Sequence, residues 1–198
     1  PKRDKDAPLL SACMIIKDEV DNLPSCLSSL NSVVDEVVIY DTGSTDGSIQ
    51  IAREAGATVI EGYWDDDFGR ARNEALAHCN GHWVMHIDAD EQFEGDAQNF
   101  RDLLLNTSAT ALLLEIMNLS DGNKHDLVHR PCRLFLRNVW HWTGRLHEQV
   151  TPRTGGERPQ LGVAPGIRLV HSGYLTTAME SKNKIERNIR IAEIDSGT

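Results

Sequence analysis

Two aspartates and a glutamate follow a short apolar segment near the middle of the chain. Residues 83–87 form an apolar run typical of a short buried strand, and Asp88, Asp90 and Glu91 come directly after it. Carboxylates at positions i and i+2 of an extended chain point the same way, and they repel unless a cation or solvent separates them. Hard oxygen ligands favour Mg²⁺ or Mn²⁺. The pattern indicates a divalent-cation site, with an exposed acidic loop as the alternative in a chain of 30 acidic residues.

Other polar clusters also stand directly after apolar runs that predict strands. They are residues 17–19, 41–46 and 65–67. Taken singly, each has an ordinary explanation as a solvated helix start, a turn or a helix N-cap. Together they carry more weight, because parallel strands bring their carboxyl ends side by side and ligands of open α/β sheets bind there. The sequence therefore predicts one polar site along the carboxyl edge of a sheet.

The first half of the chain alternates strand and helix patterns that would position these clusters. Strands are predicted at residues 9–16, 36–40, 57–60 and 83–87, and helices at residues 20–30, 47–54 and 68–79. Pro24 falls in the first turn of its helix, where proline is tolerated, and Gly56 suits a helix end. This strand–helix alternation predicts an α/β fold with a parallel sheet and right-handed crossovers.

The second half is less regular and predicts a smaller mixed or antiparallel extension. A helix is expected at residues 96–105 and strands at 110–119, 132–136 and 167–171, with a polar link at 120–126. Residues 154–165 are rich in Gly and Pro and predict a mobile loop. Residues 182–194 predict an amphipathic helix with Ile185, Ile189 and Ala192 facing inward.

Composition limits the class of protein. With 198 residues, 40% of them apolar and 25% charged, the chain is long enough for one domain with its own core, residues 1–198. A net charge of −10 argues against a nucleic-acid partner and suits a site that collects divalent cations. No apolar run is long enough for a membrane span, and no signal peptide is recognisable.

The cysteines indicate a reducing compartment. None of the four stands in a Cys-x-x-Cys spacing, which argues against structural zinc, and their apolar surroundings predict buried, reduced thiols. We therefore expect a cytoplasmic protein.

Several motifs in fixed order resemble one enzyme family. These are residues 10–19, the Asp-Thr-Gly-Ser-Thr-Asp of residues 41–46, Asp67-Phe68, the Ala-Arg-Asn-Glu of residues 71–74 and the Asp-Ala-Asp-Glu of residues 88–91. The chain is similar here to the family-2 inverting glycosyltransferases of the GT-A fold, strongly so over residues 9–95. The His-Glu-Gln of residues 147–149 and residues 171–174, with Lys184, Arg187 and Asn188, resemble a bacterial subgroup that often continues into helical repeats.

The resemblance implies a nucleotide-sugar donor, usually a uridine diphosphate (UDP) sugar, with Mn²⁺ or Mg²⁺ bridging its phosphates. By resemblance, residues 9–95 form the donor-binding half and residues 96–198 the acceptor side. The donor-binding set that it implies is Ile16, Lys17 and Glu19 around base and ribose, Asp41 at the base, Asp67, Arg72 and Asn73 beside base or diphosphate, and Asp88 and Ala89 by the ribose or sugar. Asp90 would bind the metal.

Two departures concern the nucleotide. Many family members have a second Asp where this chain has Thr42, and a Thr-Tyr pair where it has Ile16 and Lys17. The chain therefore departs from the family pattern at the positions that concern the identity of the base and aromatic stacking on it.

An inverting displacement needs a general base on the side opposite the leaving group, and Glu148 is the candidate. The alternative is that Glu148 only pairs with Arg145 on a strand edge. His147 is the fallback base, and it would point to the opposite face if the segment is extended.

Other second-half residues complete the expected site. His171, at the end of a predicted strand, is a candidate metal ligand through an imidazole nitrogen. Trp140 and Trp142 alternate along an extended segment and, with Arg145, are expected on the acceptor side. The tryptophans would stack on a sugar or peptide, with core packing the default for one of them.

Three other functions compete with a glycosyltransferase that acts on a saccharide, lipid, peptide or protein. A haloacid-dehalogenase-like phosphatase would need a second Asp where Gly43 stands. A nucleotidyltransferase that makes nucleotide sugars would need a Gly-rich basic loop where residues 17–19 stand. A non-catalytic sugar- or peptide-binding module would bind without turnover.

Overall fold

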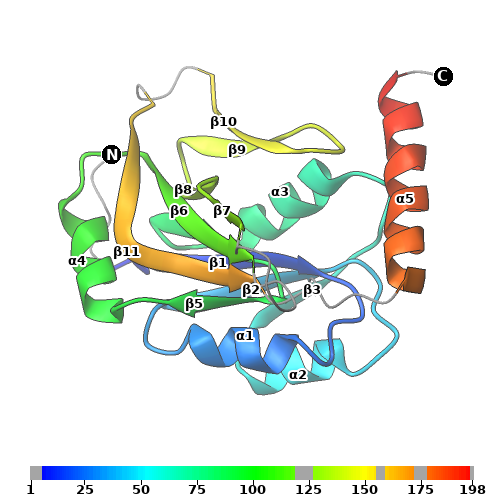
Figure 1. The fold of residues 1–198 in the computed structure, drawn as a ribbon. Helices are drawn as coiled ribbons and strands as arrows, with labels where there is room; N and C mark the ends of the chain where they lie inside the picture. The colour runs from blue at the N-terminus through cyan, green and yellow to red at the C-terminus, as the bar shows by residue number, and fades with distance from the viewer. Residues whose placement is uncertain (1–5, 119–126, 155–158, 172–177, 197–198) are drawn as a thin grey trace.

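The computed structural model describes residues 6–118, 127–154, 159–171 and 178–196. Figure 1 shows a twisted sheet with helices on both of its faces, a separate two-stranded hairpin, and a last helix that runs along one side of the molecule. The link predicted at residues 120–126 and residues 172–174 of the last motif lie outside the described residues.

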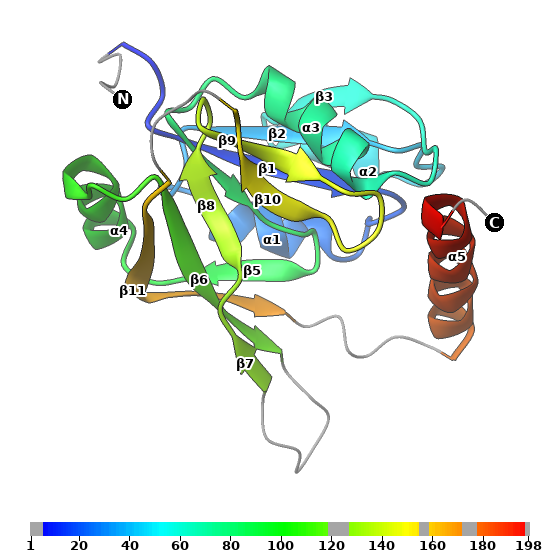
Figure 2. The same cartoon turned by 90° about the horizontal axis from the view of Figure 1, so that it is seen from above.

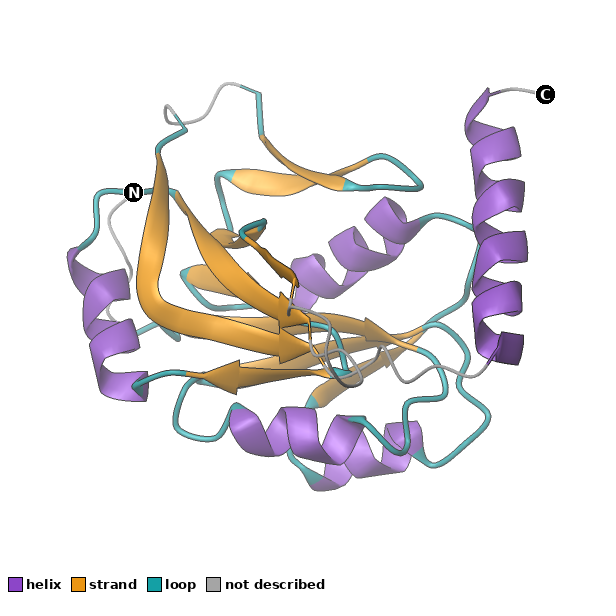
Figure 3. Ribbon diagram, in the orientation of Figure 1, coloured by secondary structure: helices purple, strands orange, loops and turns teal. Residues whose placement is uncertain are grey.

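The first half has the predicted alternation of strands and helices. Its elements are β1 (Leu10–Ile16), α1 (Leu23–Ser29), β2 (Glu36–Asp41), α2 (Ser48–Glu54), β3 (Thr58–Glu61), α3 (Phe68–His78) and β4 (Trp83–His86). The strands lie parallel in the order β3-β2-β1-β4, which confirms the predicted parallel sheet. As Figure 3 shows, α1 and α2 cover one face of this sheet, and α3 lies on the other.

The second half extends the same sheet with mostly antiparallel pairs, as predicted. Its elements are β5 (Glu91–Glu94), α4 (Ala97–Asn106), β6 (Ala111–Asn118), β7 (Leu127–His129), β8 (Cys132–Leu136), β9 (Trp140–Thr143), β10 (Gln149–Pro152), β11 (Leu161–His171) and α5 (Ala178–Ser196). The order continues from β4 through β8, β6 and β11 to β5, and β9 pairs with β10 alone. Within this extension only β6 and β11 are parallel.

The loop predicted at residues 154–165 is wrong from Leu161 onward. Strand β11 begins there and pairs with β6, and its register shifts between Val163 and Arg168. Pro165 and Gly166 lie where the register shifts. At this point the strand can accommodate Pro165, which has no backbone N–H, and Gly166, whose φ angle is 72°. The bulge explains why a Gly- and Pro-rich segment is a strand.

The inward face predicted for the last helix is also wrong. Ile185 and Ile189 of α5 are 59% and 54% exposed, and Ala192 is exposed too. Ile191 is buried instead, and Arg187 is half-buried. Figure 2 shows that α5 stands apart from the sheet, so the sheet does not determine which side of α5 is buried.

No helix in the described ranges is long and apolar enough to cross a membrane.

Gly81 lets β4 enter the sheet close beside β1. Its N–H donates to the Ser11 hydroxyl at 2.8 Å and to the Glu36 carboxylate at 3.0 Å. A Cβ at this position would lie 2.6 Å from the backbone nitrogen of Ser11 and 2.8 Å from the carbonyl oxygen of Trp83. Backbone atoms within a sheet cannot move away as a flexible side chain can, so only glycine fits at position 81.

We predict that Gly81→Ala destabilises the protein. Overpacking of this kind costs about 1–3 kcal/mol, and the free energy of unfolding in urea, followed by circular dichroism, should fall by that amount. Gly47→Ala is the control, because its Cβ would meet only Val20 at 3.5 Å. Equal losses in the two variants would contradict the prediction.

Candidate active site

A cleft of about 600 Å³ opens at the carboxyl ends of β1, β2 and β4, and we call it the main cleft. It brings together most of the predicted donor and metal residues, namely Ile16, Lys17, Glu19, Arg72, Asp88, Ala89, Asp90 and His171. Trp64, Phe68, Arg187 and Arg190 also line it. The predicted site at the carboxyl edge of the sheet is therefore a real cavity with contributions from both halves of the chain.

Asp90 and His171 form a pair inside the main cleft. Nε2 of His171 lies 2.9 Å from Oδ2 of Asp90, and both side chains are about a quarter exposed. The pairing of β11 with β5 places His171 opposite Glu91, the residue after Asp90. Two segments separated by some 80 positions thus meet at one point.

The imidazole of His171 is held in a defined orientation. Its Nδ1 lies 2.9 Å from the acceptor Oδ1 of Asn118, so Nδ1 carries a proton. The hydrogen bond to Asp90 raises the pKa of His171. A carboxylate beside an oriented imidazole is a donor set that suits a divalent metal. No group of three or more His, Cys, Asp or Glu in the described part of the chain makes a complete metal site.

A row of alternating charges runs under the cleft, and we call it the charge ladder: Glu148, Arg72, Asp88, Arg133 and Glu91. Arg72 donates to Glu148 at 2.6 Å and to Asp88 at 3.4 Å. Arg133 donates to the other Asp88 oxygen at 3.2 Å and to Glu91 at 2.9 Å. Asp88 is the most exposed member, with 34% of its side chain accessible from the cleft.

The ladder controls the ionisation of its members. Burial alone would raise the pKa of Asp88, but Arg133 and Arg72 hold it well below its ordinary value. Burial, followed by the charge of Asp88, raises the pKa of Glu91 to about 7. His86, packed against both arginines, has its pKa lowered to about 3 by burial and by their charge. At neutral pH, Asp88 is therefore ionised and His86 neutral.

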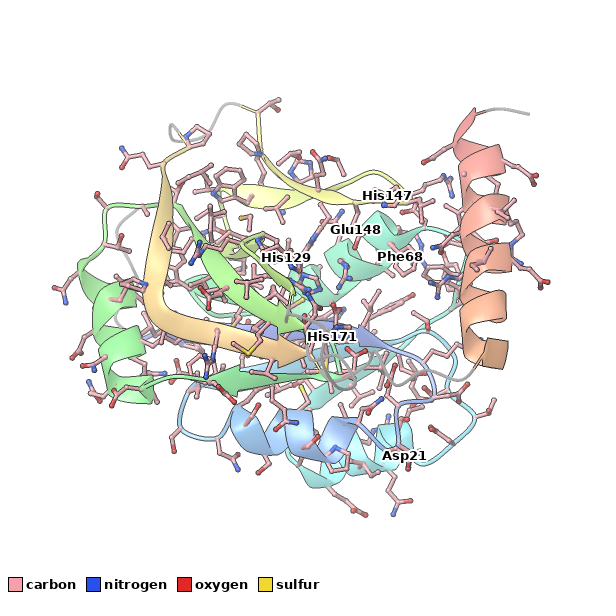
Figure 4. All side chains as sticks on the ribbon, viewed as in Figure 1. Asp21, Phe68, His129, His147, Glu148 and His171 are labelled. Carbon is pink, nitrogen blue, oxygen red and sulfur yellow. The ribbon has the colours of Figure 1, made fainter. Side chains whose placement is uncertain are left out.

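Glu148 has a different partner from the one expected. Gly144 and His147 have positive φ angles of 93° and 56°, so this segment is a turn and is not extended. The turn carries Glu148 to Arg72, while Arg145 lies 3.6 Å from Asp67. The alternative, in which Glu148 pairs with Arg145, is wrong. His147 is exposed on the same turn, and Figure 4 labels it beside Glu148.

A second cavity of about 420 Å³, the side cavity, lies on the other side of the ladder. Its lining includes Glu148, His86, His129 and Arg133, and it shares Arg72 and Asp88 with the main cleft. Two cavities with a common wall can hold two reactants, with Glu148 facing only the second. In Figure 4 the labelled Phe68, Glu148 and His171 lie in the region between the sheet, α3 and the β9–β10 hairpin.

Three predicted donor residues have other contacts and do not line the main cleft. Asp41 is 1% exposed, and its carboxylate accepts from the backbone N–H groups of Gly43 and Ser44, both at 2.9 Å, and from the Ser44 hydroxyl. Its side chain therefore stabilises the turn after β2, and Thr42 faces the cleft instead. The expectation that Asp41 contacts the base is corrected by this burial.

Asn73 and Asp67 are likewise structural. The Asn73 side chain donates to the carbonyl of Trp142 at 2.9 Å and accepts from its N–H at 3.0 Å, which fastens β9 to α3. Asp67 caps α3 by accepting from the N–H of Arg70 at 2.8 Å. Their positions in the motif reflect packing and capping, which a linear pattern does not separate from binding.

Trp140 and Trp142 are both buried, at 5% and 3% exposure. The Trp142 ring packs edge-on against Phe135 at 5.0 Å and His86 at 5.6 Å. Trp142 nevertheless lines the side cavity, together with Glu148 and Val150. Core packing, expected for one of the two, holds for Trp140, and stacking of Trp142 on an acceptor stays a prediction.

Arg133 is the main residue that the motifs missed. It is a single charge in the otherwise apolar strand β8, and a charge in a buried strand is a signal that it has a buried partner. Arg187 belongs to the motif that resembles the bacterial subgroup, but the sequence alone does not place it at the cleft.

The chain matches the model of glycosyl transferase family 2 over residues 11–143, more than half of its length. It is 24% identical to the glycosyltransferase SunS of Bacillus subtilis over 194 residues, which cover 95% of this chain and 45% of SunS. It is 48% identical over 83 residues to a TPR repeat-containing protein of Synechococcus elongatus, covering 42% of this chain and 21% of that protein. The chain spans less than half the length of each of these relatives.

The fold has a counterpart among solved structures. The crystal structure of residues 1–349 of Staphylococcus aureus TarS in complex with UDP aligns with a TM-score of 0.50 at 20% identity, over 59% of this chain and 38% of that chain. This likeness confirms the expected GT-A fold. The family match runs from β1 to β9, over more than half of the chain, and the chain therefore belongs to glycosyl transferase family 2.

Proposed function

We propose that this chain is the catalytic domain of a metal-dependent, inverting glycosyltransferase that moves a sugar from a nucleoside-diphosphate donor to an acceptor. The observation that carries the proposal is the Asp90–His171 pair, which faces the main cleft beside Asp88. The family match supports the reaction class. A UDP-sugar is the donor we favour, because the TarS structure of similar fold holds UDP.

In this proposal the nucleotide occupies the main cleft. Ile16, Lys17 and Glu19 border the base and ribose at the end of β1, with Thr42 beside them. Asp88 meets the ribose or the sugar as a carboxylate, because the ladder keeps it ionised. Ala89 leaves room between the two acids.

Asp90 and His171 would hold Mn²⁺ or Mg²⁺, with donor phosphate oxygens completing the coordination. When bound, the metal supplies positive charge that stabilises the diphosphate leaving group without a proton transfer. The task of Asn118 is to keep the imidazole of His171 turned so that Nε2 faces the same point as the Asp90 carboxylate.

Glu148 is the proposed general base, and the side cavity is the proposed acceptor site. Glu148 lines that cavity and accepts from Arg72 at 2.6 Å. As a carboxylate, Glu148 would take a proton from an acceptor held in that cavity. The acceptor classes that remain are a saccharide, a lipid, a peptide and a protein, and acceptor screening distinguishes them.

We predict that Asp90→Ala abolishes metal-dependent binding of the donor. One of the two side-chain ligands is lost, so calorimetric titration with UDP should lose its dependence on Mn²⁺, and release of UDP from UDP-sugars should stop. Asp21→Ala is the control, since Asp21 is exposed and lies outside the cleft (Figure 4). Unchanged Mn²⁺ dependence in Asp90→Ala would refute the metal assignment.

We also predict that Glu148→Gln separates binding from chemistry. Gln keeps the size of the side chain and a hydrogen-bond acceptor for Arg72 but removes basicity. UDP affinity should persist while sugar transfer or donor hydrolysis falls by about 10²–10⁴-fold. His147→Ala is the matched comparison on the same turn and should retain the parent rate. If only His147→Ala is slow, the two roles must be exchanged.

A further inference from the structure

Helix α5 presents two arginines to the main cleft. Arg187 and Arg190 line it together with Trp64, which precedes α3, and Phe68, the first residue of α3. Figure 2 shows α5 at one side of the molecule, away from the sheet. The helix is therefore placed by contacts of its side chains at the cleft.

Arg190 makes the contact that positions α5. Its guanidinium donates to both oxygens of Asp66, at 2.8 and 2.6 Å. Asp66 in turn accepts from the indole nitrogen of Trp64 at 2.8 Å. This planar two-bond geometry fixes both the distance and the direction of the helix relative to the loop.

Arg187 has a different environment. Its guanidinium lies over the ring of Phe68, 5.0 Å from the ring centroid, and it is half-buried. Among the described residues no carboxylate lies within ion-pair distance of it. Burial lowers the pKa of Arg187, while the charge of Asp66 raises it and the charge of Arg190 lowers it further. A partly desolvated cation that faces a polar cavity in this way is suited to an anion in that cavity.

The charges of the main cleft lead to the same conclusion. Its carboxylates are Asp18, Glu19, Asp88 and Asp90, in a chain of net charge −10. Of its basic side chains, Arg72 is bonded to Glu148 and Asp88, and Arg190 to Asp66. Lys17 and Arg187 are left to offset the charge of a diphosphate, and only Arg187 has the planar donors that match a phosphate.

We infer that Arg187 binds the diphosphate of the donor, and that the Arg190–Asp66 ion pair positions α5 so that Arg187 reaches it. This inference rests on the proposed function. Phe68 restricts the guanidinium to one plane, so less side-chain freedom is lost when the phosphate binds. Helix α5 is thus a part of the donor site, supplied by the far end of the chain.

The test compares uridine, UMP and UDP, each titrated with Mn²⁺ into the parent protein and into Arg187→Gln. Loss of a charged hydrogen-bond pair should weaken UDP binding about ten- to hundredfold, while uridine affinity stays unchanged. Arg53→Gln is the charge-matched control, because Arg53 pairs with Glu61 on the surface and lines no part of the cleft. Arg187→Lys, which keeps the charge without the planar fork, should lie between parent and Arg187→Gln.

Arg190→Gln tests the positioning role by a separate measurement. Amide hydrogen exchange in α5 should become faster in this variant, and the preference for UDP over uridine should shrink. If the parent protein prefers UDP to uridine, and Arg187→Gln and Arg187→Lys keep the same preference, the role of Arg187 is overturned but the proposed function is not. A parent protein that binds no nucleoside diphosphate would overturn the proposed function as well.

Discussion

The cost of burying charge governs the centre of this molecule. Removing one member of a buried ion pair leaves the other uncompensated, at a cost of about 3–5 kcal/mol. The charge ladder avoids this cost by alternating acids and arginines from Glu148 to Glu91. Its members come from the turn before β10, from α3, from β8 and from the segment that leads from β4 into β5, so the fold must bring four separate segments together to satisfy it.

Strand β4 is the place where the two halves of the sheet join. It pairs in parallel with β1 on one side and antiparallel with β8 on the other. Asp88 follows β4, where it receives Arg72 from the parallel half and Arg133 from the antiparallel extension. The same junction separates the main cleft from the side cavity. Two cavities with a shared charged wall therefore follow directly from the topology of the sheet.

The pair of Asp90 and His171 depends on the outer strands of the extension. His171 is the last residue of β11, and the pairing of β11 with β5 brings it level with the segment after β4. The bulge in β11 absorbs Pro165 and Gly166, so this pairing is kept despite residues that interrupt strands. Helix α5 completes the cleft wall with Arg187 and Arg190. Each of these features belongs to the second half of the chain, so the main cleft is shared by both halves.

Local patterns in the sequence were enough to determine the first half of this protein. Apolar runs, caps and glycines predict β1 to β4 and their helices to within a few residues, because these signals act between near neighbours, and the acids after β4 therefore fall at the cleft. The roles of Asp41, Asn73 and Trp140, the partner of Glu148 and the inward face of α5 were decided only by the tertiary structure. A side chain that turns toward a ligand and one that turns toward a distant backbone group have the same local sequence, and only long-range packing distinguishes them.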